Sequence, residues 1–145
     1  MTVLKVSYPV SVVAVFVWIG FVCAISFMEA WLKFRAPGIN LPLGLGIGRI
    51  VFNALNKVEW VLAIAIILNF LFAKQRVMEL EHLFLLAPLI ILIIQTVYAL
   101  PALDARARLH IEGSFVPPSN LHFYYVAMEA IKVTGLIVFG IKLFK

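Results

Sequence analysis

Ionisable and amide side chains interrupt an apolar segment that spans residues 48–72. The second half of the segment is apolar, and the first half carries Arg49, Asn53, Asn56, Lys57 and Glu59. On a helix the first three of these share one narrow face, which Lys57 and Glu59 flank on either side. Charged residues in a membrane span are costly, so they normally face a bundle interior or the interface and find partners there. The pattern predicts either a polar seam that joins helices or one wall of a functional site.

A second group of polar side chains opens the apolar segment at the C-terminal end of the chain. It consists of His122, Tyr125, Glu129 and Lys132. Because His122 and Glu129 are seven residues apart, they lie two turns apart on one stripe of a helix, and the other two residues lie beside this stripe. Beyond the group the segment is apolar until Lys142.

Two further apolar segments end in charged residues. Glu29 and Lys33 stand four residues apart with the glutamate first, which is the favourable order for an ion pair on a helix. Asp104 and Arg106 follow the third apolar segment. We expect Asp104 and Arg106, together with Arg49, to hold the other groups in place.

Three roles are compatible with these residue types. Carboxylates and histidine on facing helices can bind a metal ion, and the candidate ligands are Glu29, Glu59, His122 and Glu129. The same four residues can instead carry protons or bind a charged small molecule. In the third role all the charges form a structural network of ion pairs. The residues expected to support a site are Arg49, Asn53, Asn56, Asp104, Arg106, Tyr125 and Lys132.

Motifs typical of several enzyme and cofactor classes are missing from the sequence. A Glu-x-x-His pair repeated on two helices, which is typical of di-metal bundles, does not occur. Neither a nucleophile elbow nor a phosphate-binding loop is found, and the single Cys23 excludes an intramolecular disulfide. The three histidines lie in connections or at a span end, so a haem held by two of them is not expected. A non-enzymatic role is therefore favoured, with a bound transition metal as one alternative.

The composition indicates a membrane protein. Of the 145 residues, 64% are hydrophobic and 13% are charged, whereas soluble domains are roughly 45–50% apolar and about 25% charged. The net charge of +5 comes from basic residues near the ends of apolar segments, where anionic head groups attract them. There is no basic stripe with interleaved aromatic residues, so we expect no nucleic-acid partner.

Four segments are long enough to cross the hydrocarbon core of a bilayer, which takes about 20 apolar residues. They lie at about 9–34, 48–73, 79–103 and 119–144. The apolar stretch 37–47 is rich in glycine and proline, and it is predicted to be a loop that lies in the interface or folds back into the protein. The turn at 74–82 is expected to be solvated. Trp18 and Trp31 are interpreted as aromatic residues near opposite membrane interfaces.

Short connections favour a single all-α domain in which the four spans form an antiparallel bundle. In such a bundle the polar groups of all four spans lie in one half of the membrane, near one face. The other half then contains little that is polar besides Ser11, Asn69 and terminal lysines. Basic residues are almost evenly divided between the two sides. If Arg49, Lys57 and Arg106 are paired within the cluster, the remaining bias favours termini in the cytoplasm.

Three of the four spans contain runs that resemble a known family: WIGFVCAISFMEAWLKF, GRIVFNALNKVEWVLAIAIIL and LHFYYVAMEAIKVTGLIVFGI. The anchors of the resemblance are Gly20, Gly48, Arg49, Glu59 and His122. The runs resemble a family of small four-helix membrane proteins of unknown function, which is similar in outline to the membrane domains of copper-resistance D proteins. The resemblance implies a four-helix membrane fold and adds weight to the metal-binding alternative.

The sequence thus predicts a small integral membrane protein, of a plasma or inner membrane, whose polar cluster binds or passes a small ion, a proton or a polar solute. One alternative is a structural or accessory subunit of a membrane complex. Another is a small membrane enzyme, either metal-dependent or acting on a lipid or quinone. Four helices leave little room for a pore within a single chain, so transport would favour a homo-oligomer.

Overall fold

All regular structure in the described part of the chain is helical. The computed structural model of the protein describes residue 6 and residues 8–73 and 80–144, and for residues 80–82 it describes the backbone alone. Val6 and Phe144 form an isolated antiparallel β-bridge. The expected turn at 74–82 lies outside the described residues, apart from the backbone of its last three.

The first long helix joins four consecutive elements. They are α1 (Pro9–Val22), the π-helical turn η1 (Cys23–Glu29), the short α2 (Ala30–Leu32) and the 3-10 turn η2 (Lys33–Arg35). Proline stands at the start of α1, where its missing N–H costs no helical hydrogen bond. After a turn that contains Gly38 at φ +83°, the second long helix α3 (Leu41–Phe72) runs without interruption.

The third long helix also contains a π-helical turn. It joins the 3-10 turn η3 (Leu80–Leu85), α4 (Leu86–Ile94), the π-helical turn η4 (Gln95–Ala99) and α5 (Leu100–Ile111). Pro101 is the second residue after η4, and a local π-helical turn is one way in which a helix accommodates the hydrogen bond that proline cannot donate. The fourth long helix is α6 (Leu121–Lys142), with Asn120 at its N-cap position.

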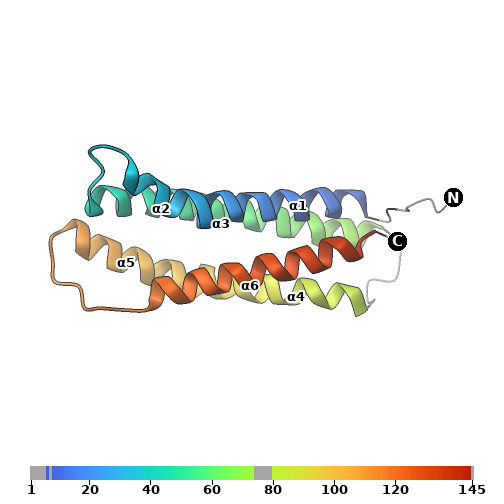
Figure 1. Cartoon of the computed structure of the whole chain (residues 1–145). Helices are drawn as coiled ribbons and strands as arrows, with labels where there is room; N and C mark the ends of the chain where they lie inside the picture. Colours follow the sequence, from blue (N-terminus) through green and yellow to red (C-terminus); the bar gives the residue numbers. More distant parts are fainter. Residues whose placement is uncertain (1–5, 7, 74–79, 145) are drawn as a thin grey trace.

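Four helices in the described chain are long and apolar enough to cross a membrane: Pro9–Arg35, Leu41–Phe72, Leu83–Ile111 and Leu121–Lys142. They confirm the all-α class and the presence of four candidate spans. Figure 1 shows them lying side by side, with α1 next to α3 and α6 next to α4. The connections 36–40 and 112–120 lie at one end, here called the loop end, and both chain termini lie toward the other end.

The prediction of a loop at 37–47 is wrong for most of its length, because α3 already begins at Leu41. The side-chain oxygen of Asn40 accepts a hydrogen bond of 3.0 Å from the backbone N–H of Leu43, which caps the helix. The glycines that suggested a loop instead allow close packing. A Cβ atom on Gly44 would overlap the ring of Phe34, which packs directly against α3 at this position.

The interior is a continuous apolar core, and the outside of the helices is also largely apolar. Side chains that are fully buried include Val15, Trp18, Val22, Ala63, Ile66, Leu92, Leu136 and Phe139. On the outside, Val61 is 66% exposed and Val97 is 74% exposed. Exposed apolar surface on this scale is typical of surfaces that meet a membrane or another protein.

Trp18 does not lie near an end of the helices. Its side chain is 0% exposed, so its interpretation as an interface residue is wrong. The physical reason is that its indole N–H has a buried carboxylate partner on α3, which no single-helix pattern can show. Trp31 is 50% exposed and lies toward the loop end of the first helix.

Candidate functional site

Three ionisable side chains meet inside the bundle, and all three are completely buried. They are Glu59 on α3 and Glu129 and Lys132 on α6, each 0% exposed. The Lys132 ammonium group contacts Glu59 Oε1, and it lies 2.8 Å from Glu129 Oε1. The two acidic side chains therefore share one cation, and we call these three residues the buried triad.

Neutral groups from two other helices complete the surroundings of the triad. The Trp18 indole N–H donates to Glu59 Oε1 at 2.8 Å. The Ser26 hydroxyl donates to Glu129 Oε2 at 2.8 Å. The Gln95 amide donates to Glu129 Oε1, and its oxygen accepts from Lys132 at 2.7 Å. Every long helix thus contributes to the site.

One oxygen atom of the triad has no partner. Among the buried side-chain nitrogen and oxygen atoms of the described residues, Glu59 Oε2 alone lacks a hydrogen bond. Buried polar atoms are nearly always hydrogen-bonded, so an exception calls for a physical reason. The charges are also unbalanced, because two ionised carboxylates and one ammonium group leave one negative charge in excess. A single bound proton would restore the charge balance, and Glu59 Oε2 is the carboxylate oxygen of the triad that has no other partner.

The two π-helical turns lie on either side of Glu129. Ser26 belongs to η1, and Gln95 is the first residue of η4, so each turn supplies one hydrogen bond to the same carboxylate. A π-helical turn shifts the side chains that follow it relative to a regular α-helix, and such turns are frequent at functional sites. The backbone irregularities of both helices are thus located where their side chains meet the triad.

The triad lies near the middle of the helices. Lys132 is close to the centre of α6, about 15 Å from either end at a rise of about 1.5 Å per residue. The predicted single cluster near one face is therefore divided into two layers. One layer is the buried triad with its hydrogen-bond donors, and the other is a set of ion pairs at the loop end.

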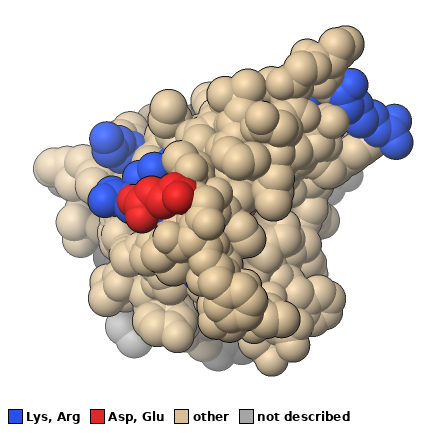
Figure 2. Space-filling view, turned by 90° about the vertical axis from the view of Figure 1, so that its left-hand side faces the viewer, with Lys and Arg blue, Asp and Glu red and all other residues tan. Residues whose placement is uncertain are grey.

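The loop-end layer is more exposed and consists of local pairs. Arg49 pairs with Asp104, which also accepts from Arg108 at 2.9 Å. Glu29 pairs with Lys33 at 3.2 Å, as the spacing of four residues predicted. Figure 2 faces this end and shows a mostly uncharged surface with acidic and basic atoms side by side in one place and a separate basic group elsewhere.

The other charged and amide residues of the predicted site have separate partners. The Arg106 guanidinium donates to the backbone oxygen of Pro117 at 2.6 Å. Asn53 donates to the backbone oxygen of Arg49, on its own helix, at 2.7 Å. The Lys57 side chain is exposed. These residues do not reach the buried triad.

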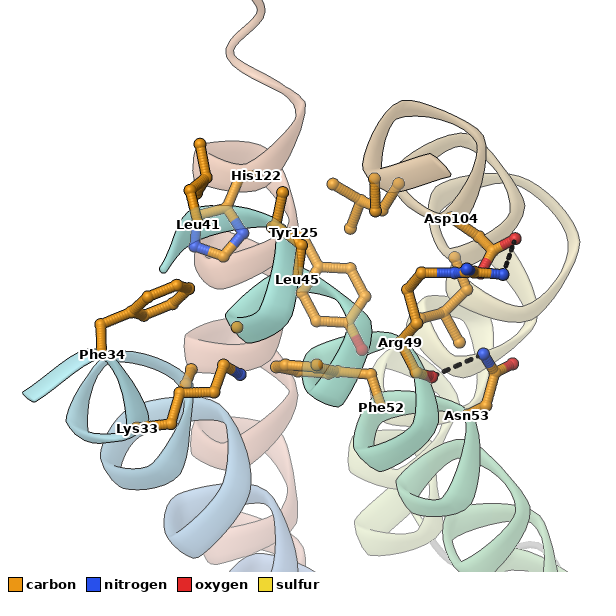
Figure 3. Close-up of a pocket in the computed structure, with 16 residues that line it drawn as sticks. Lys33, Phe34, Leu41, Leu45, Arg49, Phe52, Asn53, Asp104, His122 and Tyr125 are labelled. Atoms are coloured by element: carbon orange, nitrogen blue, oxygen red, sulfur yellow. Dashed lines mark hydrogen bonds and ion pairs between the residues drawn. The ribbon is translucent and has the colours of Figure 1, made fainter. Parts of the chain in front are cut away.

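A pocket of about 280 Å³ lies between the loop end and the triad. Residues of all four long helices line it, and Figure 3 labels ten of them. His122 and Lys33 lie on one side of the pocket and the Arg49–Asp104 pair on the other, with Tyr125 and Phe52 between them. The Tyr125 side chain is 2% exposed, and it stands one helical turn before Glu129 on the same face of α6.

The narrow polar face of α3 joins that helix to η4. Asn56 and Trp60 both donate to the hydroxyl oxygen of Thr96, each at 2.9 Å. Thr96 in turn donates to the backbone oxygen of Leu92, one turn earlier on the same helix, at 2.7 Å. This part of the polar pattern is therefore a seam between two helices, which was one of the two predicted roles. Glu59 points away from this seam, toward α1 and α6.

The structure brings together two of the four candidate ligands. Glu59 and Glu129 meet at Lys132, whereas Glu29 pairs with Lys33 and His122 lines the pocket. Within the described ranges no group of three histidine, cysteine or acidic residues is placed to hold a metal ion. The predicted grouping of all four residues does not form, because their side chains belong to different layers and already have other neighbours.

Sequence reasoning missed several members of the site. Lys132 was expected to support the site and instead lies at its centre. Trp18 was assigned to an interface, and Ser26 and Gln95 were not among the candidates. A polar residue in the middle of an apolar helix was the available signal for Ser26 and Gln95. No comparable signal marked Trp18, because tryptophan is common both in cores and at membrane interfaces.

Comparison with protein-family models, curated proteins and solved structures finds no match for this chain.

Proposed function

We propose that this protein is an integral membrane protein, an antiparallel bundle of four spans, whose buried triad binds or passes a proton, a small ion or a polar solute. The four long apolar helices and their apolar outer surface support placement in a bilayer. The triad then lies near the midplane, and all three of its charged groups face the bundle interior.

The observation that carries the proposal is the buried triad with its unpaired oxygen, Glu59 Oε2. Placing ionisable groups inside a membrane costs free energy, so such groups by default mark a functional site. Buried ion pairs can often be replaced by apolar residues without loss of stability. Stability alone therefore gives little reason for a sequence to keep two glutamates and a lysine in this position.

A second candidate function is that of an accessory subunit whose polar groups only join helices. The Asn56–Thr96–Trp60 seam favours it, because this chain does use polar contacts to hold two helices together. The two candidates make different predictions for the triad. A purely structural triad affects stability alone, whereas a functional triad affects the movement or binding of a ligand in the folded protein.

The substitution Glu59→Gln separates the two candidates. The full chain is reconstituted in lipid vesicles that contain a pH-sensitive dye, and an ionophore for potassium sets the membrane potential. Proton movement is compared between the parent protein, Glu59→Gln and Asn56→Ala, and the unfolding of each variant is measured in detergent. Glu59→Gln keeps the shape of the side chain and removes its charge, while Asn56→Ala breaks the seam and leaves the triad intact.

We expect Glu59→Gln to abolish proton movement while the protein stays folded, and Asn56→Ala to lower stability and preserve movement per folded molecule. Equal proton movement in the parent and Glu59→Gln vesicles would contradict proton passage through the triad. If, in addition, calorimetry detects no binding of small ions or solutes to the parent protein, the results support the purely structural role.

The remaining features of the proposed function concern orientation and assembly. We place both termini in the cytoplasm, in a plasma or inner membrane. Ion pairs with carboxylates neutralise Lys33, Arg49 and Arg108 at the loop end, so the remaining basic bias of the sequence lies on the side of the termini. Passage across the whole bilayer favours a homo-oligomer or a larger membrane complex, since four helices packed around one core leave little room for a pore within a single chain. Crosslinking in native membranes tests the assembly, and protease access to a C-terminal tag tests the orientation.

A further inference from the structure

We infer, as an extension of the proposed function, that the species handled by the buried triad is the proton, that Glu59 Oε2 receives it, and that it arrives from the loop end through the pocket behind Tyr125. The inference depends on three features of the structure. They are the occupied surroundings of the carboxylates, the position of the pocket, and the apolar packing on the opposite side of the triad.

The surroundings of the triad leave room for a proton and not for a metal ion. Lys132 already occupies the position between Glu59 and Glu129 that a cation shared by two carboxylates would take. The Trp18 indole N–H already donates a hydrogen bond to Glu59 Oε1. Ser26 and Gln95 already donate hydrogen bonds to the two oxygens of Glu129. A metal ion needs several ligand atoms at once. A proton needs one oxygen, and Glu59 Oε2 is free.

The pocket provides a route from the loop end. Its mouth contains Phe34 and Leu41, whose side chains are 39% and 52% exposed. Its inner wall contains Tyr125 and Phe52, whose rings meet edge to face with centroids 5.5 Å apart. Figure 3 shows the Tyr125 hydroxyl on the deep side of the ring, away from His122. Because Tyr125 stands on the pocket wall one helical turn before Glu129, we place it between the pocket and the triad.

Groups from the neighbouring helices define the electrostatic surroundings of Glu59. Lys132 and Glu129 face it from α6, Trp18 faces it from α1, and Tyr125 lies within range of electrostatic interaction with both carboxylates. A proton on Oε2 makes the triad neutral overall. In the transfer, a hydronium ion in the pocket gives up a proton and remains as water, and Glu59 gains an O–H bond.

Toward the chain termini the described side chains next to the triad are apolar and closely packed. The next inward-facing side chains in that direction are fully buried: Val15, Ala63, Ile66, Leu136 and Phe139. Farther along, the Ser11 hydroxyl donates to Asn69 Oδ1 at 2.9 Å, and this pair forms no connection to the triad. Proton exchange at Glu59 is therefore expected from the loop end.

Infrared spectroscopy of the purified full chain in lipid nanodiscs tests this inference. A protonated carboxyl group gives a C=O stretching band that is separate from that of a carboxylate and shifts when its proton is replaced by deuterium. The rate of this shift in D₂O measures access to the group. The variants are Glu59→Gln, which assigns the band, and Leu45→Trp, which fills the pocket. Val61→Trp is the matched control, since it adds the same side chain to the outer face of the same helix.

We expect one protonated carboxyl band in the parent protein that disappears in Glu59→Gln. We expect Leu45→Trp to slow its deuteration by about tenfold or more, the effect of a modestly higher barrier, and Val61→Trp to leave it unchanged. A parent protein without a protonated carboxyl band overturns the assignment of the proton. A band whose deuteration is equally fast in Leu45→Trp and in the parent overturns the route.

The vesicle experiment keeps this inference distinct from the proposed function. Proton movement that requires Glu59 but is unaffected by Leu45→Trp supports the proposed function and rejects the route. Exchange at Glu59 that is slowed by Leu45→Trp, in a protein without any proton movement across vesicles, supports the route and rejects passage across the bilayer.

Discussion

The indole N–H of Trp18 and the ammonium group of Lys132 converge on the same oxygen atom, Glu59 Oε1, from two different helices. The other oxygen of this carboxylate, Oε2, has no partner. Because the two donors come from α1 and α6, they fix the orientation of a side chain that belongs to α3. The free oxygen is thereby held in a defined position inside the bundle.

Replacement of Trp18 by phenylalanine tests the contribution of the indole hydrogen bond. Trp18→Phe keeps an aromatic ring in the core and removes the donor to Glu59. We expect a loss of about 1–3 kcal/mol in the free energy of unfolding, since a buried carboxyl group loses a hydrogen bond, together with some loss of packing. Denaturant unfolding in detergent micelles measures it. Trp31→Phe is the control, because the Trp31 side chain is 50% exposed, and an equal effect of both substitutions would contradict the role of Trp18.

Removal of the shared cation is expected to be more damaging than removal of the whole triad. In Lys132→Met both carboxylates lose their charged partner, and breaking a buried ion pair in this way costs about 3–5 kcal/mol. The triple variant Lys132→Met, Glu59→Gln, Glu129→Gln carries no charge at this position. We expect it to recover more than half of the lost stability, measured by thermal unfolding in the same detergent. A triple variant less stable than Lys132→Met would show that the carboxylates stabilise the fold without the lysine.

The long apolar segments and their polar interruptions contained enough information to predict four long apolar helices. They also identified Glu59 and Glu129 as candidate residues of a buried site. The spacing of four residues between Glu29 and Lys33 correctly indicated their ion pair. These predictions succeeded because they depend on helix geometry and on the cost of charge in an apolar environment, both of which act within a single segment.

Predictions that depended on the relation between helices were less successful. The rotation of each helix about its own axis decides whether Trp18 faces the outside of the bundle or a carboxylate. The apolar residues of α1 are spread almost evenly around the helix, so the sequence does not indicate this rotation. The start of α3 at Leu41 was missed because glycine and proline suggested a loop. In the structure Pro42 lies in the first turn, where it is tolerated, and Gly44 makes room for Phe34.

The glycines of two helices provide a test of close packing. A Cβ atom on Gly140 of α6 would lie 3.0 Å from Val15 Cγ1 on α1, whereas one on Gly20 would meet nothing within 4 Å. We expect Gly140→Leu to destabilise the protein by about 1–3 kcal/mol through overpacking. Gly20→Leu is expected to be neutral or stabilising, because glycine weakens a helix interior by about 0.5–1 kcal/mol. Thermal unfolding of both variants in one detergent checks the difference, and an equal effect would contradict the packing of α1 against α6.

Thr96 is the acceptor shared by Asn56 and Trp60, so its replacement tests the seam independently of the buried triad. Thr96→Val keeps the shape of the side chain and removes the hydroxyl. Hydrogen bonds between membrane helices contribute about 0.6 kcal/mol on average and up to about 1.7 kcal/mol, and we expect a loss within this range. A double-mutant cycle with Asn56→Ala measures the coupling, which should be positive because the two side chains are in contact. Proton movement in vesicles should be unchanged in Thr96→Val, and a loss of movement at full stability would mean that the seam belongs to the functional site.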